Sequence, residues 1–193
     1  MNWTAIVPIK PTGLGKTRLA GLLGPDQRAR LGERMRDHVL AVLGGIPNLE
    51  VRLLCPSPPA DWAGHWIADT GRGLNAEIRS AARTVSSRLL VVHADLPMLQ
   101  ADDIKALLGA AKNGIAIAPD RHGTGTNALA LADPRALRFV FGPDSFARHR
   151  RQAPDAIVID RPGLAHDLDT PDDLAVLLGS GPIDSAMRDA IAA

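Results

Sequence analysis

The sequence predicts one layered α/β domain over residues 1–193, and three observations lead to this fold class. Short apolar runs alternate with segments of helical periodicity, which is the pattern of a sheet covered by helices. The 193 residues, 46% of them hydrophobic, suffice for one sizeable core but are few for two full domains. No internal repeat or low-complexity linker divides the chain.

Six short apolar runs are the expected strands. They cover Thr4–Ile9, Val51–Cys55, Leu89–Val92, Ile115–Ala118, Ala128–Leu131 and Ile157–Ile159. A first helix is expected over residues 26–43, where apolar residues recur at helical spacing. Asp102 or Asp103 can cap a second helix, which ends at Asn113 and Gly114.

Thr170 is the expected N-cap of a third helix, with Pro171 in the first helical position. Asp173 stands three residues after this cap, as in a capping box, and apolar residues follow it. The acidic residues at this helix start also suit the positive end of the helix dipole.

Charge and cysteine content exclude several classes of partner and site. Lys and Arg (22) nearly balance Asp and Glu (21), so neither nucleic acid nor an anionic membrane is an expected partner. Cys55 is the only cysteine, which excludes an internal disulfide and a thiolate metal cage and fits the cytoplasm. No apolar run approaches the roughly 20 residues that span a bilayer, and no signal-peptide layout is present.

The stretch "IVPIKPTGLGKTRL", residues 6–19, looks at first like a phosphate-binding loop of the ATPase type. That loop follows the pattern G-x-x-x-x-G-K-[ST], and the position of its first glycine is taken here by Lys10. Pro8 and Pro11 would also remove two amide donors from a phosphate nest. The stretch therefore departs from the ATPase pattern at a defining residue.

What remains is an apolar strand, a turn containing Gly15 and a helix start that directs N–H groups at an anion. Lys16 would contact the same anion, with Lys10 and Arg18 nearby. Such a loop would hold phosphates in a less enclosed way than the ATPase loop does. A solvated basic loop is the alternative.

Three carboxylates form a second candidate group. Asp95 follows the apolar run "RLLVVHADLPML" and is expected just past the carboxyl end of a buried strand, where α/β sheets bind ligands. Asp167 and Asp169 precede the third helix, and an extended backbone would point both to the same side. Magnesium prefers such oxygen ligands together with substrate phosphates. The alternative is that all three only cap turns and a helix.

Other loops carry small polar residues at element boundaries. Gly73 and Asn75 would suit the approach of a nucleobase or ribose, although a plain turn and cap explains them almost as well. Thr126, Gly142 and Ser145 offer hydroxyls and open amides for a carboxylate or phosphate. The histidines without zinc-type spacing, expected to be solvated or locally bonded, are His122, His149 and His166.

Six motifs occur in a fixed order: "VPIKPTGLGKTRLAGLL", "GLNAEI", "ADLPML", "APDRHGTGTNAL", "FGPDSFARH" and "AHDLDTPDDL". Because it carries these six motifs in this order, the chain resembles the phospholactate guanylyltransferase family of coenzyme F-420 biosynthesis over residues 6–178. The resemblance implies a single-domain, Rossmann-like nucleotidyltransferase fold with a mixed, mostly parallel sheet flanked by helices. It also implies transfer of GMP from GTP to a small phosphorylated acid, with pyrophosphate released. Phosphoenolpyruvate, 3-phospho-D-glycerate and 2-phospho-L-lactate are the candidate acids.

The resemblance also implies roles for residues in the matching motifs. The nucleotide would be bound by Lys10, Gly15, Lys16, Arg18, Gly73 and Asn75. Magnesium would be held by Asp95, Asp167 and Asp169, and the phosphorylated acid by Thr126, Gly142 and Ser145. Lys16 and Asp95 would be the catalytic residues.

A phosphate monoester is largely dianionic at neutral pH, so such an acceptor needs no general base. Catalysis then reduces to alignment and charge neutralisation. A glycosyltransferase of similar fold is one alternative, but such enzymes typically carry Asp-x-Asp after the strand, where this chain has His93 before Asp95. A non-catalytic nucleotide-binding module is another. Whether the chain forms a homodimer stays open.

Overall fold

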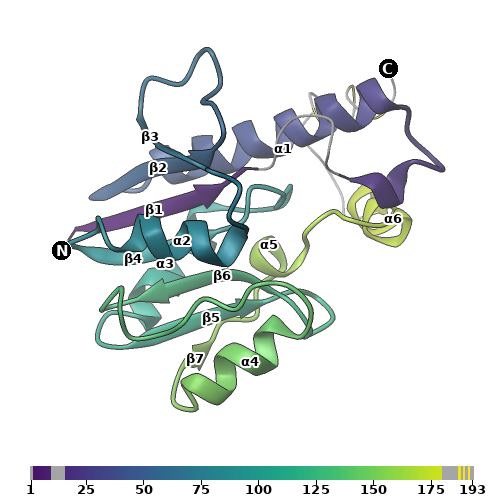
Figure 1. The fold of residues 1–193 in the computed structure, drawn as a ribbon. Helices are drawn as coiled ribbons and strands as arrows, with labels where there is room; N and C mark the ends of the chain where they lie inside the picture. Colours follow the sequence, from purple (N-terminus) through teal and green to yellow (C-terminus); the bar gives the residue numbers. More distant parts are fainter. Residues whose placement is uncertain (1, 10–15, 180–186, 188, 190, 192–193) are drawn as a thin grey trace.

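The structure is a computed structural model, and it describes residues 2–9, 16–179, 187, 189 and 191. One seven-stranded sheet forms its centre, in the order β3-β2-β1-β4-β6-β5-β7 (Figure 1). The strands are β1 (Trp3–Pro8), β2 (Leu49–Cys55), β3 (His65–Ala68), β4 (Arg88–Val92), β5 (Ile115–Pro119), β6 (Thr126–Leu131) and β7 (Ile157–Val158). Among the described strands only β6 runs antiparallel to its neighbours, β4 and β5. The expected mixed, mostly parallel α/β sheet is confirmed.

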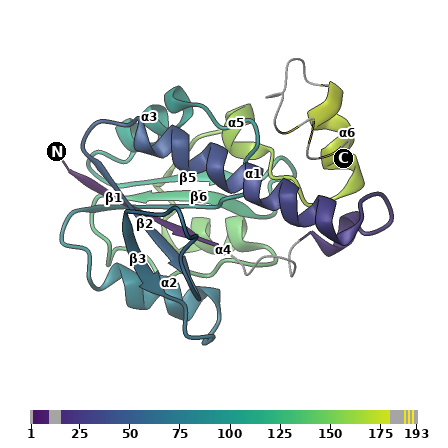
Figure 2. The same cartoon turned by 90° about the horizontal axis from the view of Figure 1, so that it is seen from above.

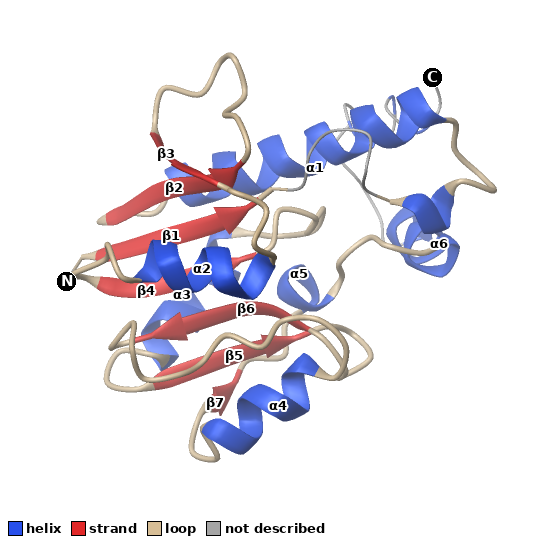
Figure 3. Ribbon diagram, in the orientation of Figure 1, coloured by secondary structure: helices blue, strands red, loops and turns tan. Residues whose placement is uncertain are grey.

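Helices cover both faces of this sheet, and along the chain they separate most of the successive strands (Figure 3). They are η1 (Thr17–Leu19), α1 (Pro25–Gly44), α2 (Leu74–Ala82), α3 (Ala101–Ala110), α4 (Ser145–Gln152), α5 (Pro162–Ala165) and α6 (Pro171–Gly179). Helices α1, α3 and α5 lie on one face and α2 and α4 on the other (Figure 2). Within the described residues no helix is long and apolar enough to cross a bilayer.

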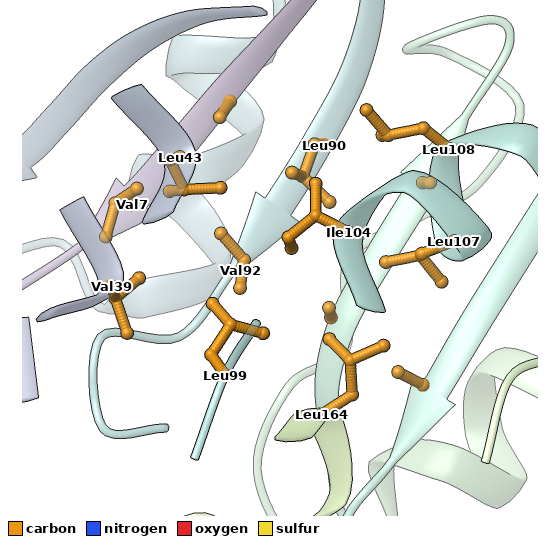
Figure 4. Close-up of a cluster of buried hydrophobic side chains, with 14 of the residues drawn as sticks. Val7, Val39, Leu43, Leu90, Val92, Leu99, Ile104, Leu107, Leu108 and Leu164 are labelled. Atoms are coloured by element: carbon orange, nitrogen blue, oxygen red, sulfur yellow. The ribbon is translucent and has the colours of Figure 1, made fainter. Parts of the chain in front are cut away.

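Alternation of side chains along the central strands builds the two halves of the core. Val7, Leu90 and Val92 pack against α1 and α3 on one face (Figure 4). Their neighbours Ile6 and Leu89 belong to the cluster under α2 on the other face. Because side chains on a strand alternate and both faces of the sheet are covered, the central strands are mostly apolar, as their sequences indicated.

A third, smaller apolar cluster lies at the carboxyl end of the sheet. It joins η1, the first half of α1 and α6 through Leu19, Leu23, Leu31, Met35, Leu168, Leu174, Leu177 and Met187. The cluster therefore fixes the segment after β1 against the segment that leads into α6. These are the two segments that carry Lys16 and Asp169.

Two local expectations are corrected. The helix expected from Asp102 or Asp103 begins at Ala101, so Gln100 is its N-cap. Asp103 instead occupies the third position, where its Oδ2 accepts a hydrogen bond from the Gln100 N–H at 2.9 Å. Strand β3 was not expected, because this edge strand is largely exposed and has no apolar run. By contrast, Asp173 caps α6 as expected, accepting from the N–H of Thr170 at 2.7 Å.

Candidate active site

A cavity of about 520 Å³ opens at the carboxyl edge of the parallel strands. The predicted site residues in its wall are Lys16, Asp95, Thr126, Gly142, Ser145, Asp167 and Asp169. Strand direction explains the meeting of these distant segments. β4 ends at this edge just before Asp95, whereas antiparallel β6 begins here with Thr126 and Asn127. Another hollow, of about 470 Å³, lies around Trp3 and Glu50 and contains none of the predicted residues.

Lys16 lies between two carboxylates in this cavity. Its Nζ donates to Asp95 Oδ2 at 2.7 Å and to Asp169 Oδ1 at 2.8 Å, and its side chain is 9% exposed. Its backbone is left-handed, with φ 58° and ψ 33°. Burial alone would lower the pKa of Lys16, but the two ion pairs outweigh it and raise the pKa above its usual value. The ammonium therefore stays charged.

Backbone contacts bring the two acidic segments together. The Leu168 N–H donates to the carbonyl oxygen of Asp95 at 3.1 Å, and Leu168 is buried in the third apolar cluster. The buried amide of Asn127 donates to the carbonyl of Leu164 at 3.0 Å and to Asp167 Oδ1 at 3.1 Å. Packing and hydrogen bonds to uncharged groups therefore hold the Asp95 and Asp167 segments together, in addition to the ion pairs of Lys16.

The surroundings of Asp167 disfavour its charged form. Burial, and secondly the charge of Asp95, raise the pKa of Asp167 to about 6. The hydrogen bond from Asn127 opposes this rise only in part. A cation at this place would therefore relieve an unfavourable concentration of negative charge.

Asp95, Asp167 and Asp169 fit a magnesium ion in donor chemistry, since all supply hard oxygen ligands beside a cavity. They are not arranged as a ready-made cage: the part of the chain that the structure describes contains no group of three or more His, Cys, Asp or Glu side chains placed to hold a metal. The Lys16 ammonium instead neutralises Asp95 and Asp169. Magnesium binding stays a prediction.

Thr126, Gly142 and Ser145 come together on another part of the cavity wall. Ser145 begins α4, and its N–H donates to the Gly142 carbonyl at 3.1 Å. Gly142 has φ 112°, a conformation that side chains disfavour. Thr126 and Ser145 are 2% and 1% exposed, so their hydroxyls have fixed surroundings. This wall combines hydroxyls with the amino end of a helix, which suits an anion.

Asp120 holds the loop that leads into Thr126, a role that was not predicted. Its carboxylate accepts from the N–H of Thr124 at 2.8 Å and from the N–H of Gly125 at 2.7 Å. A Cβ at Gly125 would lie 2.7 Å from Asp120 Oδ2, so a side chain at this position would displace the carboxylate from its hydrogen bonds. Asp followed by a Gly- and Thr-rich stretch is a recognisable signal for such a turn.

Gly73 and Asn75, expected near the nucleoside, flank the start of α2. Gly73 is the N-cap, with φ 91°, and α2 contributes Leu74 to the cavity wall. Both polar atoms of the Asn75 amide bind backbone: Nδ2 donates to the Phe141 carbonyl at 3.0 Å, and Oδ1 accepts from the Phe141 N–H at 2.7 Å. Asn75 therefore holds the residue before Gly142.

Of the predicted nucleotide-binding residues that the structure describes, Lys16 lines the cavity, whereas Arg18, Gly73 and Asn75 do not. Lys10 and Gly15 lie outside the described residues. Arg18 is exposed on η1. Two cations that were not predicted, Arg28 and Arg36 on α1, do line the cavity. Their spacing of eight residues, two steps of four, places them on one helix face and was the available signal.

The family described as "Guanylyl transferase CofC like" matches residues 3–186. The chain is 41% identical to a phosphoenolpyruvate guanylyltransferase from Sphaerobacter thermophilus, covering 95% of this chain and 96% of the relative. A protein of the same name from Rubrobacter xylanophilus is 36% identical, with 95% and 97% covered.

Solved structures support the fold. A putative nucleotide-diphospho-sugar transferase from Desulfovibrio desulfuricans superimposes with a TM-score of 0.77 at 19% identity, covering 100% of this chain and 94% of that one. A 4-diphosphocytidyl-2C-methyl-D-erythritol synthase gives a TM-score of 0.59 at 12% identity, with 91% and 96% covered. At such identities the likeness concerns the fold alone. With the family match spanning almost the whole chain, this protein belongs to the CofC-like guanylyl transferase family.

Proposed function

We propose that this chain transfers GMP from GTP to a small phosphorylated acid in coenzyme F-420 biosynthesis, with phosphoenolpyruvate as the first candidate acid. One observation carries the proposal. A single cavity combines the cluster of Lys16, Asp95 and Asp169 with a separate wall that carries the hydroxyl residues Thr126 and Ser145. Such a cavity suits two anions that must be brought together. The relatives named for phosphoenolpyruvate favour that acid over 3-phospho-D-glycerate and 2-phospho-L-lactate.

The acceptor wall would hold the acid by its negative charges. Thr126 and Ser145 supply hydroxyl donors, and Ser145 stands at the amino end of α4, where the helix dipole favours an anion. Because these groups are nearly fully buried and fixed by the fold, their side chains lose little conformational entropy when the acid binds. The wall thereby orients one phosphate oxygen of the acid.

That oxygen attacks the α-phosphorus of GTP. A phosphoanhydride bond forms between the acid and GMP, and the bond between the α- and β-phosphates breaks to release pyrophosphate. A phosphate monoester is already largely deprotonated at neutral pH, so no proton has to be removed. The side chains therefore need only align two anions and offset their charge.

Charge is offset by Lys16 and by a magnesium ion that Asp95, Asp167 and Asp169 would hold. Bound magnesium would neutralise phosphate oxygens of nucleotide and acid. Lys16 stays protonated in its buried position, so its ammonium can exchange a carboxylate for a phosphate oxygen of the nucleotide. Arg28 and Arg36 add positive charge to the cavity wall on the α1 side.

A matrix assay tests this proposal. Purified protein is incubated with magnesium and either GTP or ATP, with each of the three acids in turn, and pyrophosphate and product mass are recorded. We expect pyrophosphate only when GTP and an acid are both present, together with a mass equal to GMP joined to that acid. Because the product anhydride is labile, a coupled downstream transferase traps it. Orthophosphate from ATP without acid, or no acid dependence, would refute the proposal.

A further inference from the structure

His149 is a buried titratable side chain that the proposed chemistry does not use. It lies on α4, is 0% exposed, and packs edge-on against Phe141 with ring centroids 5.2 Å apart. Its two ring nitrogens have different partners. Nε2 is 3.1 Å from the backbone nitrogen of Val140, and Nδ1 is 3.0 Å from Thr126 Oγ1.

The contact with Val140 fixes the tautomer of the ring. A backbone N–H can only donate, so Nε2 must present its lone pair. In the neutral imidazole the proton then resides on Nδ1. Burial, and secondly Arg148, lower the pKa of His149 to about 4, so the neutral form prevails at physiological pH.

The tautomer in turn fixes the role of the Thr126 hydroxyl. With Nδ1 as the donor, Thr126 Oγ1 is the acceptor of this hydrogen bond. The hydroxyl proton is thereby directed away from His149. His149 is the one hydrogen-bond partner of Thr126 Oγ1 among the described residues, and Thr126 lies in the cavity wall. The hydroxyl can therefore donate to an anion in the cavity.

We propose that His149 is a positioning residue that holds the Thr126 hydroxyl as a hydrogen-bond donor to the phosphorylated acid. The inference rests on the proposed function, in which Thr126 binds that acid. An anion accepts hydrogen bonds but donates none, so a hydroxyl that must accept from Nδ1–H is preset for the acid. Without the hydrogen bond from Nδ1–H, the Thr126 hydroxyl proton could point either into the cavity or towards the place of the imidazole ring.

His149 also holds the Val140 backbone, so the test must separate the two contacts. His149→Phe keeps a ring of similar size but binds neither partner. His149→Asn places an amide N–H close to the position of Nδ1, so it can still donate to Thr126, while its short side chain does not reach Val140. Both variants lose the hydrogen bond from the Val140 N–H. A difference between them therefore reports the contact with Thr126 and not the loss of the Val140 bond.

Steady-state kinetics with GTP and phosphoenolpyruvate give the first readout. We expect His149→Phe to raise the KM for the acid about tenfold, the loss of roughly one hydrogen bond to a charged group, with the KM for GTP changed less than twofold. His149→Asn should recover most of that loss. In a Thr126→Val background, His149→Phe should raise the KM for the acid less than about twofold further. Equal defects in both His149 variants, or an undiminished effect in the Thr126→Val background, would overturn the inference.

A spectroscopic measurement tests the first step without any turnover. In ¹⁵N-labelled protein the His149 ring should show a protonated Nδ1 and an unprotonated Nε2 at pH 7, a signal pair that disappears in His149→Asn. The opposite tautomer would overturn the inference while leaving the proposed function intact. Wild-type protein that neither binds any of the three acids in calorimetry nor converts them would refute the proposed function, and this inference with it.

Discussion

The N–H of Leu168 donates a hydrogen bond to the carbonyl oxygen of Asp95 at 3.1 Å, which joins two acidic segments that are distant in sequence. Leu168 is 1% exposed and packs in the apolar cluster between η1, α1 and α6. The carboxylates are therefore brought together by backbone and apolar contacts. Their charges should be removable without unfolding the protein.

Asp95→Asn and Asp167→Asn should each lower kcat/KM by about a hundredfold or more, because each removes one negative charge from the predicted magnesium site. The amide keeps the shape of the carboxylate, and an oxygen remains to accept from Lys16 or Asn127. The midpoint of thermal unfolding should therefore change little. Asp102→Asn, which changes an exposed carboxylate paired with Lys105, is the matched control and should retain activity. Near-normal turnover in both site variants would remove the metal assignment.

Removal of the Lys16 ammonium should strengthen magnesium binding in the absence of nucleotide. In Lys16→Met the carboxylates of Asp95 and Asp169 lose their internal cation, so the divalent ion no longer competes with it. We expect millimolar magnesium to raise the unfolding midpoint of this variant by several degrees more than that of wild type. Activity should fall nonetheless, because the variant lacks the ammonium that is proposed to bind a phosphate of the nucleotide.

Two further variants control this experiment. Lys105→Met removes an exposed lysine of a surface ion pair and should respond to magnesium as wild type does. Adding Asp167→Asn to Lys16→Met should abolish the extra stabilisation. A magnesium response that is the same in wild type and in Lys16→Met would show that Lys16 does not occupy the ion's place.

The central sheet and the acid cluster were predictable because they follow from local pattern. Buried central strands are mostly apolar, and Asp95 lies three residues past the end of one of them. Asp167 and Asp169 precede a helix whose capping box, Thr170 and Asp173, can be recognised in the sequence. Residues that terminate regular elements can therefore be assigned to one edge of the sheet before their contacts are known.

Other features depend on contacts between segments that sequence spacing does not encode. Asn75 binds the backbone of Phe141, and Asn127 binds that of Leu164, each from a distant element. The antiparallel direction of β6, which brings Thr126 to the carboxyl edge, is likewise a property of topology. Edge strand β3 has only one residue of four that is not exposed, so it lacked the apolar pattern of the central strands.

Asn75→Asp should impair the use of the acid more than the use of GTP. The variant cannot donate to the Phe141 carbonyl and places a carboxylate against it, which loosens the segment that ends at Gly142. We expect a loss of about 1–3 kcal/mol in the free energy of unfolding and a several-fold rise in the KM for the acid. A rise confined to the KM for GTP would instead support direct contact between Asn75 and the nucleoside.

Gln152 supplies a matched control for this prediction. Its amide makes the same pair of hydrogen bonds, accepting from the Arg138 N–H at 3.0 Å and donating to the Arg138 carbonyl at 3.1 Å. This clamp is exposed, and neither residue lines the described part of the cavity. Gln152→Glu should therefore lower stability less and leave both KM values near those of wild type.

His149 should make stability depend on pH in a defined direction. Its pKa is about 4 in the folded protein and 6.5 by its ordinary value, so the unfolded chain binds more protons between these two pH values. The contribution of His149 is therefore fully present above pH 6.5 and is lost as the pH falls towards 4, by about 3 kcal/mol in total. Asp167, with its pKa raised to about 6, acts in the opposite direction as the pH rises from 3.8.

Urea unfolding of wild type, His149→Phe and Asp167→Asn at several pH values from 4.5 to 7.5 separates these two groups. The destabilisation caused by His149→Phe should be larger at pH 7.5 than at pH 4.5, because the variant lacks the ring that the unfolded wild-type chain protonates in acid. Asp167→Asn should become more stabilising relative to wild type as the pH rises from 4.5 to about 6 and should then level off, because in this range the folded wild-type chain keeps a proton that the unfolded chain has released. A His149→Phe effect that stays constant with pH would mean that the ring titrates alike in the folded and unfolded chains, and that its burial does not keep it neutral.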